Sequence, residues 1–307
     1  MTASLRFAFP LFLLGSIVLS AGPLFVRLAD VGAVQSAFWR LAIAAPMLLL
    51  LVRALEGRVP SLPSGRSALW LILGGLFFAA DLASWHLGIE RTTLANSTLL
   101  ANATAFLFPI WGYAVIRRWP TRTAGIALLL AAAGIVTLAG QSASVSPVNL
   151  SGDLLCLLAA IFYTGYLIVM NKARAGLSAL SALSFATIAG ALFLLPVALL
   201  DGGAFWPQDW TPLLILALSS QVAGQGLIIY ALPHLPPLAS GIGLLVQPLF
   251  SALLGFLWFA EILTAVDVAG MAMIFVAILL VRRPSGATPA VEKRVPPSLG
   301  GAQAPNR

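Results

Sequence analysis

Residues 81–113, DLASWHLGIERTTLANSTLLANATAFLFPIWGY, decide the fold of this chain. The stretch reads as two apolar helices joined by a very short turn at residues 90–93. Both helices carry polar side chains that a simple membrane anchor does not need, namely Asp81, Trp85, His86, Asn96 and Asn102. Apolar segments of about 20 residues span a bilayer, and ionisable groups inside them are costly enough to indicate function. We therefore expect a helical hairpin in the membrane whose polar groups do more than anchor it.

The composition of the whole chain is that of an integral membrane protein. Of its 307 residues, 60% are hydrophobic and only 9% are charged, whereas about 25% of a soluble domain is charged. The formal net charge is +7, but the basic residues fall between apolar spans, where they direct topology and contact anionic lipid. Membrane lipid is therefore an expected partner, and nucleic acid is not.

Ten apolar segments long enough to cross a membrane follow one another along the chain. They cover approximately residues 7–26, 34–55, 68–89, 93–116, 121–140, 151–171, 179–200, 211–231, 236–259 and 264–282. We expect the first to be a retained helix and not a cleaved signal peptide, because Pro23 directly follows the small residues of the would-be cleavage site. Residues 283–307, rich in Pro, Gly, Ala and charge, predict a disordered cytoplasmic tail. The prediction is an all-α integral membrane protein with ten transmembrane helices.

The charges of the loops predict the orientation of these spans. If the N-terminus is cytoplasmic, fourteen of the 17 basic residues lie on the cytoplasmic side, which is the positive-inside pattern. The loops of the opposite side keep only Arg27 and Arg91 and take most of the acidic residues. We expect a multi-pass protein of the bacterial inner (plasma) membrane with both termini in the cytoplasm.

An internal repeat divides the ten spans into two sets of five. Residues 94–97 (LANS) resemble residues 238–241 (LASG) at an offset near 144, and the similarity continues through the next span of each half. Because five is odd, the second half is inverted relative to the first, which is typical of secondary transporters. The predicted domains are one five-helix repeat at 7–140 and a second at 151–282.

Short motifs within the spans match one known family, together with the five-plus-five span count. The motifs are FWR at 38–40, LANSTLLAN at 94–102, LVQP at 245–248 and Glu261. In these features the chain resembles the EamA-domain branch of the drug/metabolite transporter superfamily over residues 7–282. It departs from the family near Ala105, where a proline is common, and at Arg117-Arg118, where Gly-Glu is common. The resemblance implies a transporter of small metabolites, commonly an exporter of amino acids or related compounds.

Two opposite charges lie inside predicted spans at a similar depth. Arg40 is roughly 9 Å from the outer end of the second span at 1.5 Å per residue, and Asp81 lies comparably deep in the third. Isolated charges at this depth are costly, so mutual pairing is the cheapest arrangement. We expect an intramembrane ion pair that holds two helices together; a proton relay or gate is the alternative.

Other polar side chains fall on helix faces that can converge on one pathway. Phe78, Asp81 and Trp85 share one face of the third span, while His86 points to the adjacent quadrant. The predicted substrate-binding residues are Trp85, His86, Asn102, Tyr163, Gln225 and Gln247. For any single residue of this set, an interfacial aromatic belt or ordinary helix–helix hydrogen bonding is the alternative explanation.

The sequence offers no support for an enzyme. His86, His234 and Cys156 are its only histidines and cysteine, so neither a metal-ligand cluster nor a Cys/His nucleophile is expected. No GxxxxGK[ST] phosphate loop is present, which argues against coupling to ATP. We predict a secondary transporter without cofactor or metal, working by alternating access, with an amino acid or planar organic metabolite as substrate. A lipid flippase or another non-transport membrane protein is the alternative, and the oligomeric state stays open.

Overall fold

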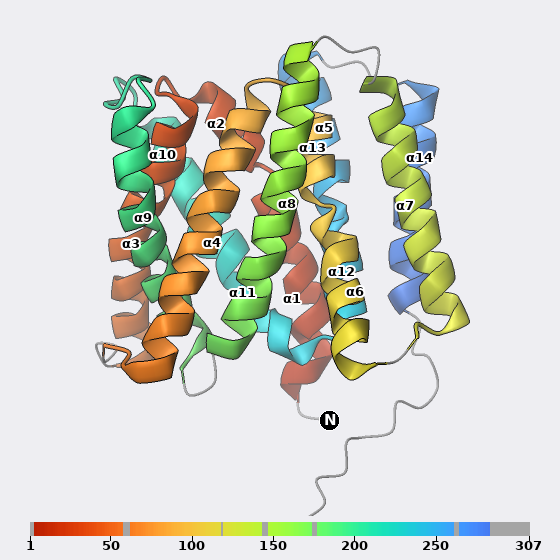
Figure 1. Ribbon diagram of the computed structural model, residues 1–307, viewed down its shortest axis with the longest axis horizontal. Helices are drawn as coiled ribbons and strands as arrows, with labels where there is room; N and C mark the ends of the chain where they lie inside the picture. Colours follow the sequence, from red (N-terminus) through yellow and green to blue (C-terminus); the bar gives the residue numbers. More distant parts are fainter. Residues whose placement is uncertain are drawn as a thin grey trace, which may run out of the picture.

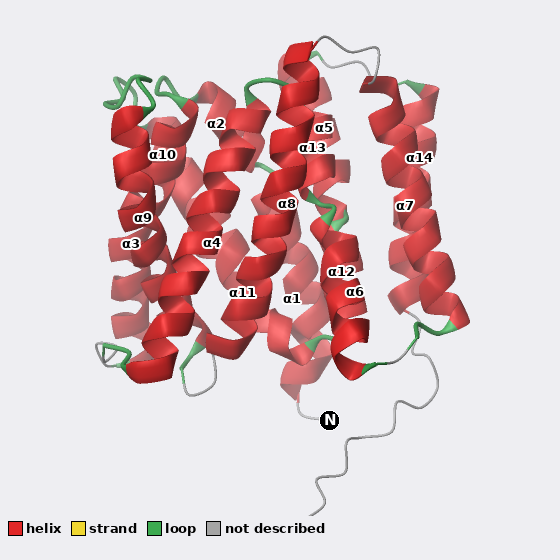
Figure 2. Cartoon of the chain, in the orientation of Figure 1, coloured by secondary structure: helices red, strands yellow, loops and turns green. Residues whose placement is uncertain are grey.

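Helices make up the regular structure of the chain (Figure 2). The computed structural model describes residues 3–57, 62–117, 119–142, 147–173, 177–260 and 264–282. Every regular element within these ranges is a helix. The predicted tail at 283–307 lies outside the described residues.

The helices of the two halves follow in chain order. The first half contains α1 Ala3–Leu19, α2 Gly22–Leu28, α3 Ala33–Glu56, α4 Gly65–Ile89, α5 Leu94–Ala101, α6 Thr104–Ile116 and α7 Arg122–Ser142. The second half contains α8 Pro147–Ala173, α9 Ala179–Leu200, α10 Thr211–Leu216, the π-helix η1 Ala217–Gly224, α11 Gln225–Ala231, the short 3₁₀ helix η2 Leu232–His234, α12 Pro237–Leu244, α13 Val246–Phe259 and α14 Ala265–Arg282.

Eight helical segments among the described residues are long and apolar enough to cross a membrane. They correspond to all the predicted spans except the fifth and tenth. Those two contain the shorter apolar stretches Arg122–Gly134 in α7 and Val268–Ala277 in α14. The all-α membrane fold is therefore confirmed, and the full count of ten spans stays a prediction.

Several predicted spans are interrupted where the sequence analysis placed one continuous helix. Two breaks have a proline as their cause: Pro23 and Pro248 each stand four residues after the last residue of the preceding helix, Leu19 and Leu244. A proline ring crowds the carbonyl of the residue four positions earlier and offers no N–H to it. The helix therefore ends there, and a new one begins around the proline.

The fourth span breaks between α5 and α6 without a proline at the junction. Here the Asn102 side chain acts on the backbone, because its Nδ2 donates a hydrogen bond to the Thr98 carbonyl at 2.7 Å. Asparagine side chains compete with backbone groups in this way and favour turns over helix interiors. The backbone continues as a tight turn, in which the Ala105 N–H donates to the Asn102 carbonyl at 2.8 Å.

The helices pack with the two-fold symmetry expected of two related halves. Each of the main contacts either joins equivalent helices of the two halves or has a counterpart in which the halves change places. α3 packs on α9, the α5–α6 pair on α12–α13, and α7 on α14, so equivalent spans meet each other. α4 packs on α8, and α1 packs on η1 and α11, which is the same contact with the halves exchanged. Figure 1 shows α3 and α9 at one end of the bundle and α7 with α14 at the other. An inverted repeat predicts this arrangement, whereas the domain boundaries 7–140 and 151–282 stay a prediction.

The two ends of the bundle differ in charge. We call the end at which α1 begins and α3 ends the lower face, as drawn in Figure 1, and the opposite end the upper face. Described basic residues at the lower face include Arg53, Arg66, Arg117, Arg122 and Lys172. The upper face carries Arg27 and Arg91 with the acidic residues Asp30, Glu90, Asp153, Asp201 and Asp209.

Candidate functional site

A small polar cavity lies between the two halves of the bundle. Its volume is ≈ 40 Å³. It is lined by Leu19, Arg40, Phe78, Asp81, Leu82, Trp85, Ala101, Asn102, Tyr163, Gln225 and Gln247. Since one water needs about 10–15 Å³ on such a scale, this conformation has room for a few water molecules but not for a metabolite.

The cavity brings together seven of the eight residues singled out in the sequence. Five are predicted substrate contacts, and the other two are the predicted ion pair; they are Trp85, Asn102, Tyr163, Gln225, Gln247, Arg40 and Asp81. They come from α3, α4, the end of α5, α8, α11 and α13, so both halves contribute. Their role in binding stays a prediction.

His86 is the candidate that does not line the cavity. Its side chain is fully buried, and its Nδ1 lies 2.8 Å from the Ser36 hydroxyl and 3.2 Å from the Ala33 carbonyl oxygen. These contacts join α4 to the first turn of α3. The geometry is that of a histidine bonding a neighbouring helix, which was the alternative given for it above.

Arg40 is buried to 1% exposure, and an amide holds it. Its Nε donates to Gln221 Oε1 at 3.3 Å, and Gln221 Nε2 in turn donates to the Thr187 hydroxyl at 2.9 Å. The guanidinium carbon lies 5.9 Å from the centre of the Phe78 ring, within reach of a cation–π interaction. This network joins α3 to η1 and α9.

Arg40 and Asp81 face the same cavity without touching each other. Within the described ranges, no carboxylate oxygen lies within 4.0 Å of a nitrogen of the Arg40 guanidinium. The Asp81 carboxylate likewise forms no hydrogen bond with a described residue. A direct ion pair between the two residues therefore stays a prediction. In this conformation both charges are open to a third group in the cavity.

Three hydrogen-bond donors of the cavity residues are also without a partner among the described residues. They are Arg40 Nη1, Gln225 Nε2 and Gln247 Nε2. Buried polar groups are nearly always satisfied in folded proteins, so each exception calls for an explanation. Three free donors and a free carboxylate around one cavity are what a site for a polar ligand provides.

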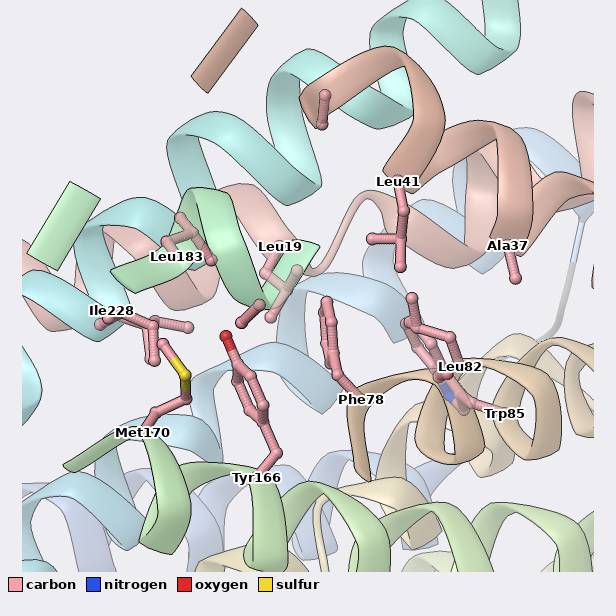
Figure 3. Packing of buried hydrophobic residues seen from close by; sticks show 14 of the residues in the cluster. Leu19, Ala37, Leu41, Phe78, Leu82, Trp85, Tyr166, Met170, Leu183 and Ile228 are labelled. Atoms are coloured by element: carbon pink, nitrogen blue, oxygen red, sulfur yellow. The ribbon is translucent and has the colours of Figure 1, made fainter. Parts of the chain in front are cut away.

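Aromatic rings form one wall of the cavity and continue below it. The Phe78 and Tyr166 rings stack with centroids 4.5 Å apart, and Tyr163 stacks on Tyr166 at 5.7 Å. Figure 3 shows Tyr166 between Met170 and Phe78, with Leu82 and Trp85 further along. The Tyr163 hydroxyl donates to Gln225 Oε1 at 3.2 Å. The wall is therefore apolar except for these hydroxyl and amide groups.

Two cavity residues stand at the helix breaks. Asn102 lies between α5 and α6, and Gln247 is the second residue of α13, after the break at Leu245. Figure 1 shows α5 above α6 and α13 above α12, so both breaks lie within the bundle and away from its two faces. Discontinuous helices meeting inside the membrane are typical of substrate sites in secondary transporters.

The sequence analysis missed part of this site. Its predicted substrate-binding residues include Gln225 but not Gln221, which lies four residues earlier and is the hydrogen-bond partner of Arg40. The π-helix η1, which carries Gln221, was not predicted; such turns are frequent at functional sites. Among the described residues, no group of three His, Cys, Asp or Glu side chains lies close enough to bind a metal.

An all-helical membrane bundle with paired halves and a polar cavity between them has the architecture typical of secondary transporters. Residues 150–283 match the EamA-like transporter family. An uncharacterized transporter of Archaeoglobus fulgidus is 25% identical over 236 residues, covering 75% of this chain and 81% of that protein. The uncharacterized transporter YetK of Bacillus subtilis is 27% identical over 269 residues, covering 83% and 81%. The chain is therefore a membrane transporter whose second half matches the EamA-like transporter family.

A solved crystal structure shares the fold. It superposes with a TM-score of 0.67 over 91% of this chain and 97% of the other chain, at 16% sequence identity. At this identity the similarity concerns the arrangement of the helices alone.

Proposed function

We propose that this protein is a secondary transporter that exports an amino acid or a related zwitterionic metabolite by alternating access. The observation that carries the proposal is the set of free donors and the free carboxylate around one cavity at the helix breaks. The positive-inside pattern supports a cytoplasmic lower face in a bacterial inner membrane.

A zwitterion matches the two kinds of free group in the cavity. Its carboxylate would accept hydrogen bonds from Arg40 Nη1 and from the amides of Gln225 and Gln247. Its ammonium group would lie against the Asp81 carboxylate. Hydrogen bonds to ionised partners are roughly twice as strong as neutral ones, and burial keeps water from competing for them. The zwitterion also leaves the net charge of the site unchanged, since it is neutral overall.

The aromatic wall favours a substrate with an apolar or planar side chain. Trp85 is held in place by a hydrogen bond from its Nε1 to the Ser97 carbonyl at 3.2 Å. Its ring offers a flat surface on which an apolar side chain or a second ring can pack. Ammonium and carboxylate would thus be bound at the charged end and the side chain at the aromatic end.

Transport requires that this cavity widen. Sites for small molecules usually measure about 300–1,000 Å³, far more than the ≈ 40 Å³ of the present conformation. This conformation therefore corresponds to a closed state. The breaks beside Asn102 and Leu245 are points at which half-helices can tilt without breaking a regular helix. If the cavity opened toward only one face at a time, the site would be accessible from the two sides of the membrane in turn.

The test is counterflow of radiolabelled amino acids into proteoliposomes containing the purified protein. For the preferred substrate, Gln247→Ala should reduce the initial rate about tenfold or more, because it removes a hydrogen bond to a charged group worth about 1.5–3 kcal/mol. Trp85→Ala should reduce it about two- to tenfold, because it removes a ring contact worth about 0.5–1.5 kcal/mol. Met273→Ala is the matched control. Met273 is half-buried on α14, outside the cavity lining, and its variant should transport normally.

Two outcomes would contradict this assignment. Loss of transport in Met273→Ala with normal rates in Trp85→Ala and Gln247→Ala would place the pathway elsewhere. Translocation of a fluorescent phospholipid, with no counterflow of any amino acid, would support the flippase alternative.

A further inference from the structure

The consecutive helices α6 and α7 hardly touch each other in the described residues. α7 packs on α14 and on α5, above α6, so the lower halves of α6 and α7 diverge. A groove of ≈ 460 Å³ lies between them at the lower face. It is lined by Ile110, Tyr113, Ala114, Arg117, Trp119, Pro120 and Leu128. We propose that this groove binds one anionic phospholipid of the surrounding membrane.

The lining divides into parts that suit the two ends of a phospholipid. Ile110, Ala114 and Leu128 form an apolar trough along the helices, suited to an acyl chain. Arg117 stands at the lower end, where its guanidinium can pair with a phosphate group. Tyr113 and Trp119 add amphipathic rings, and Trp119 is 94% exposed. Such rings are enriched at the level of the lipid headgroups, where an exposed indole gains contacts.

The local charge selects an anionic headgroup. The segment from Tyr113 to Arg122 contains three arginines and no acidic residue. Basic pockets between membrane helices are typical sites for anionic lipid headgroups. A zwitterionic headgroup would also bring an ammonium group close to these arginines, so it would bind less favourably than an anionic headgroup. The trough and the charge together therefore favour an anionic phospholipid over a neutral lipid.

The turn that ends α6 does not require an arginine at position 117. Arg117 ends α6 in the left-handed conformation, with φ 50°. Ala260 ends α13, the corresponding helix of the second half, in the same way with φ 52°. Because an alanine is enough to make this turn, the arginine at the lower face is free to serve another purpose. At this position the Arg117 side chain can bind the phosphate of a lipid headgroup.

The neighbourhood of the groove faces lipid. Ile110, Val115 and Ile116 on α6 are 57–61% exposed, as expected for side chains in contact with acyl chains. A lipid seated here would fill the space between α6 and the peripheral pair α7–α14. Its binding should therefore stabilise the attachment of that pair to the bundle.

The test uses the purified full-length protein in detergent, titrated with dioleoyl-phosphatidylglycerol, dioleoyl-phosphatidylcholine or inorganic phosphate. Native mass spectrometry counts bound lipid, and thermal unfolding measures its effect. We expect phosphatidylglycerol alone to bind stoichiometrically and to raise the melting temperature. Arg117→Gln should weaken this binding about fivefold, the effect of one basic residue at a membrane surface. Ala114→Trp should also weaken it, by filling the trough without changing the charge.

Arg66→Gln is the control, because Arg66 is an exposed arginine of the lower face, on α4 and outside the groove. Its variant should bind phosphatidylglycerol like the wild type. Equal binding of phosphatidylcholine, an equal effect of inorganic phosphate, or wild-type binding by both groove variants would each overturn the proposal. So would lipid-dependent formation of a dimer through this face, which would indicate a second copy as the occupant. Since no readout involves transport, the result is independent of the function proposed above.

Discussion

Arg40 is a buried cation that contacts no carboxylate among the described residues, which is an unfavourable state in a low-dielectric interior. The Gln221 amide and the Phe78 ring offset part of this cost. They leave Arg40 Nη1 without a hydrogen-bond partner among the described residues, and Arg40 lines the same cavity as Asp81. A zwitterionic ligand would offset this cost, because its carboxylate would pair with Arg40 and its ammonium group with Asp81.

The coupling of these two charges can be measured with a double-mutant cycle. Asp81→Asn should lower the free energy of unfolding, because Arg40 then loses the nearest compensating charge. Combining it with Arg40→Gln should recover part of that loss, with a coupling energy of about 0.5–3 kcal/mol, as found for interacting neighbours. The measurement is thermal unfolding of the four proteins in one detergent. Strict additivity of the single changes would show that the two residues do not interact.

At the scale of elements, glycine lets two helices approach closely. A Cβ added at Gly75 on α4 would collide with the Ala189 side chain on α9 and come within 2.8 Å of the Gly190 backbone nitrogen. Small residues at such crossings are the usual means of packing helices in membranes. The contact sets the distance between α4 and α9, and α4 carries Asp81 and Trp85. Packing at Gly75 therefore positions the cavity wall.

Gly75→Ala should destabilise the protein by about 1–3 kcal/mol, the usual cost of overpacking. Gly125→Ala is the control, because Gly125 lies in α7 with open space around its Cβ position. There the alanine should be neutral or stabilise by up to about 1 kcal/mol through its better helix propensity. Thermal unfolding of both variants decides the matter. Equal melting temperatures would mean that the α4–α9 crossing can relax without cost.

At the scale of the molecule, the two faces differ in charge although the helix pairing is two-fold. The folding pattern could be inserted in either orientation, so the basic residues of the lower face decide between them. The orientation is open to a direct test.

Single cysteines at Ser64 and Ala204 should report the orientation. Both positions are exposed, Ser64 between α3 and α4 at the lower face and Ala204 in the loop before α10 at the upper face. The native Cys156 is fully buried and gives little background. In intact cells an impermeant maleimide should label Ala204→Cys and spare Ser64→Cys. The opposite labelling would reverse the topology and contradict the cytoplasmic assignment of the lower face.

The sequence by itself determined the features that depend only on residues close to one another along the chain. Hydropathy over about 20 residues locates a span without knowledge of the rest of the chain. The 3.6-residue period likewise placed Phe78, Asp81 and Trp85 on one helix face, and the structure has all three on the cavity. The same period turned His86 away from that face, where the structure has it bonded to α3. The breaks at Pro23 and Pro248 were also within reach of local rules.

Only the tertiary structure decided which residues meet across helices. Arg40 donates a hydrogen bond to Gln221, 181 residues away, whereas charge alone would pair it with Asp81. The divergence of α6 from α7 depends on the packing of α7 on α14, far along the chain. Such contacts follow from crossing angles and rotamers that are set when all the helices pack together. A local pattern specifies the face of a helix, whereas its partner is chosen by the whole bundle.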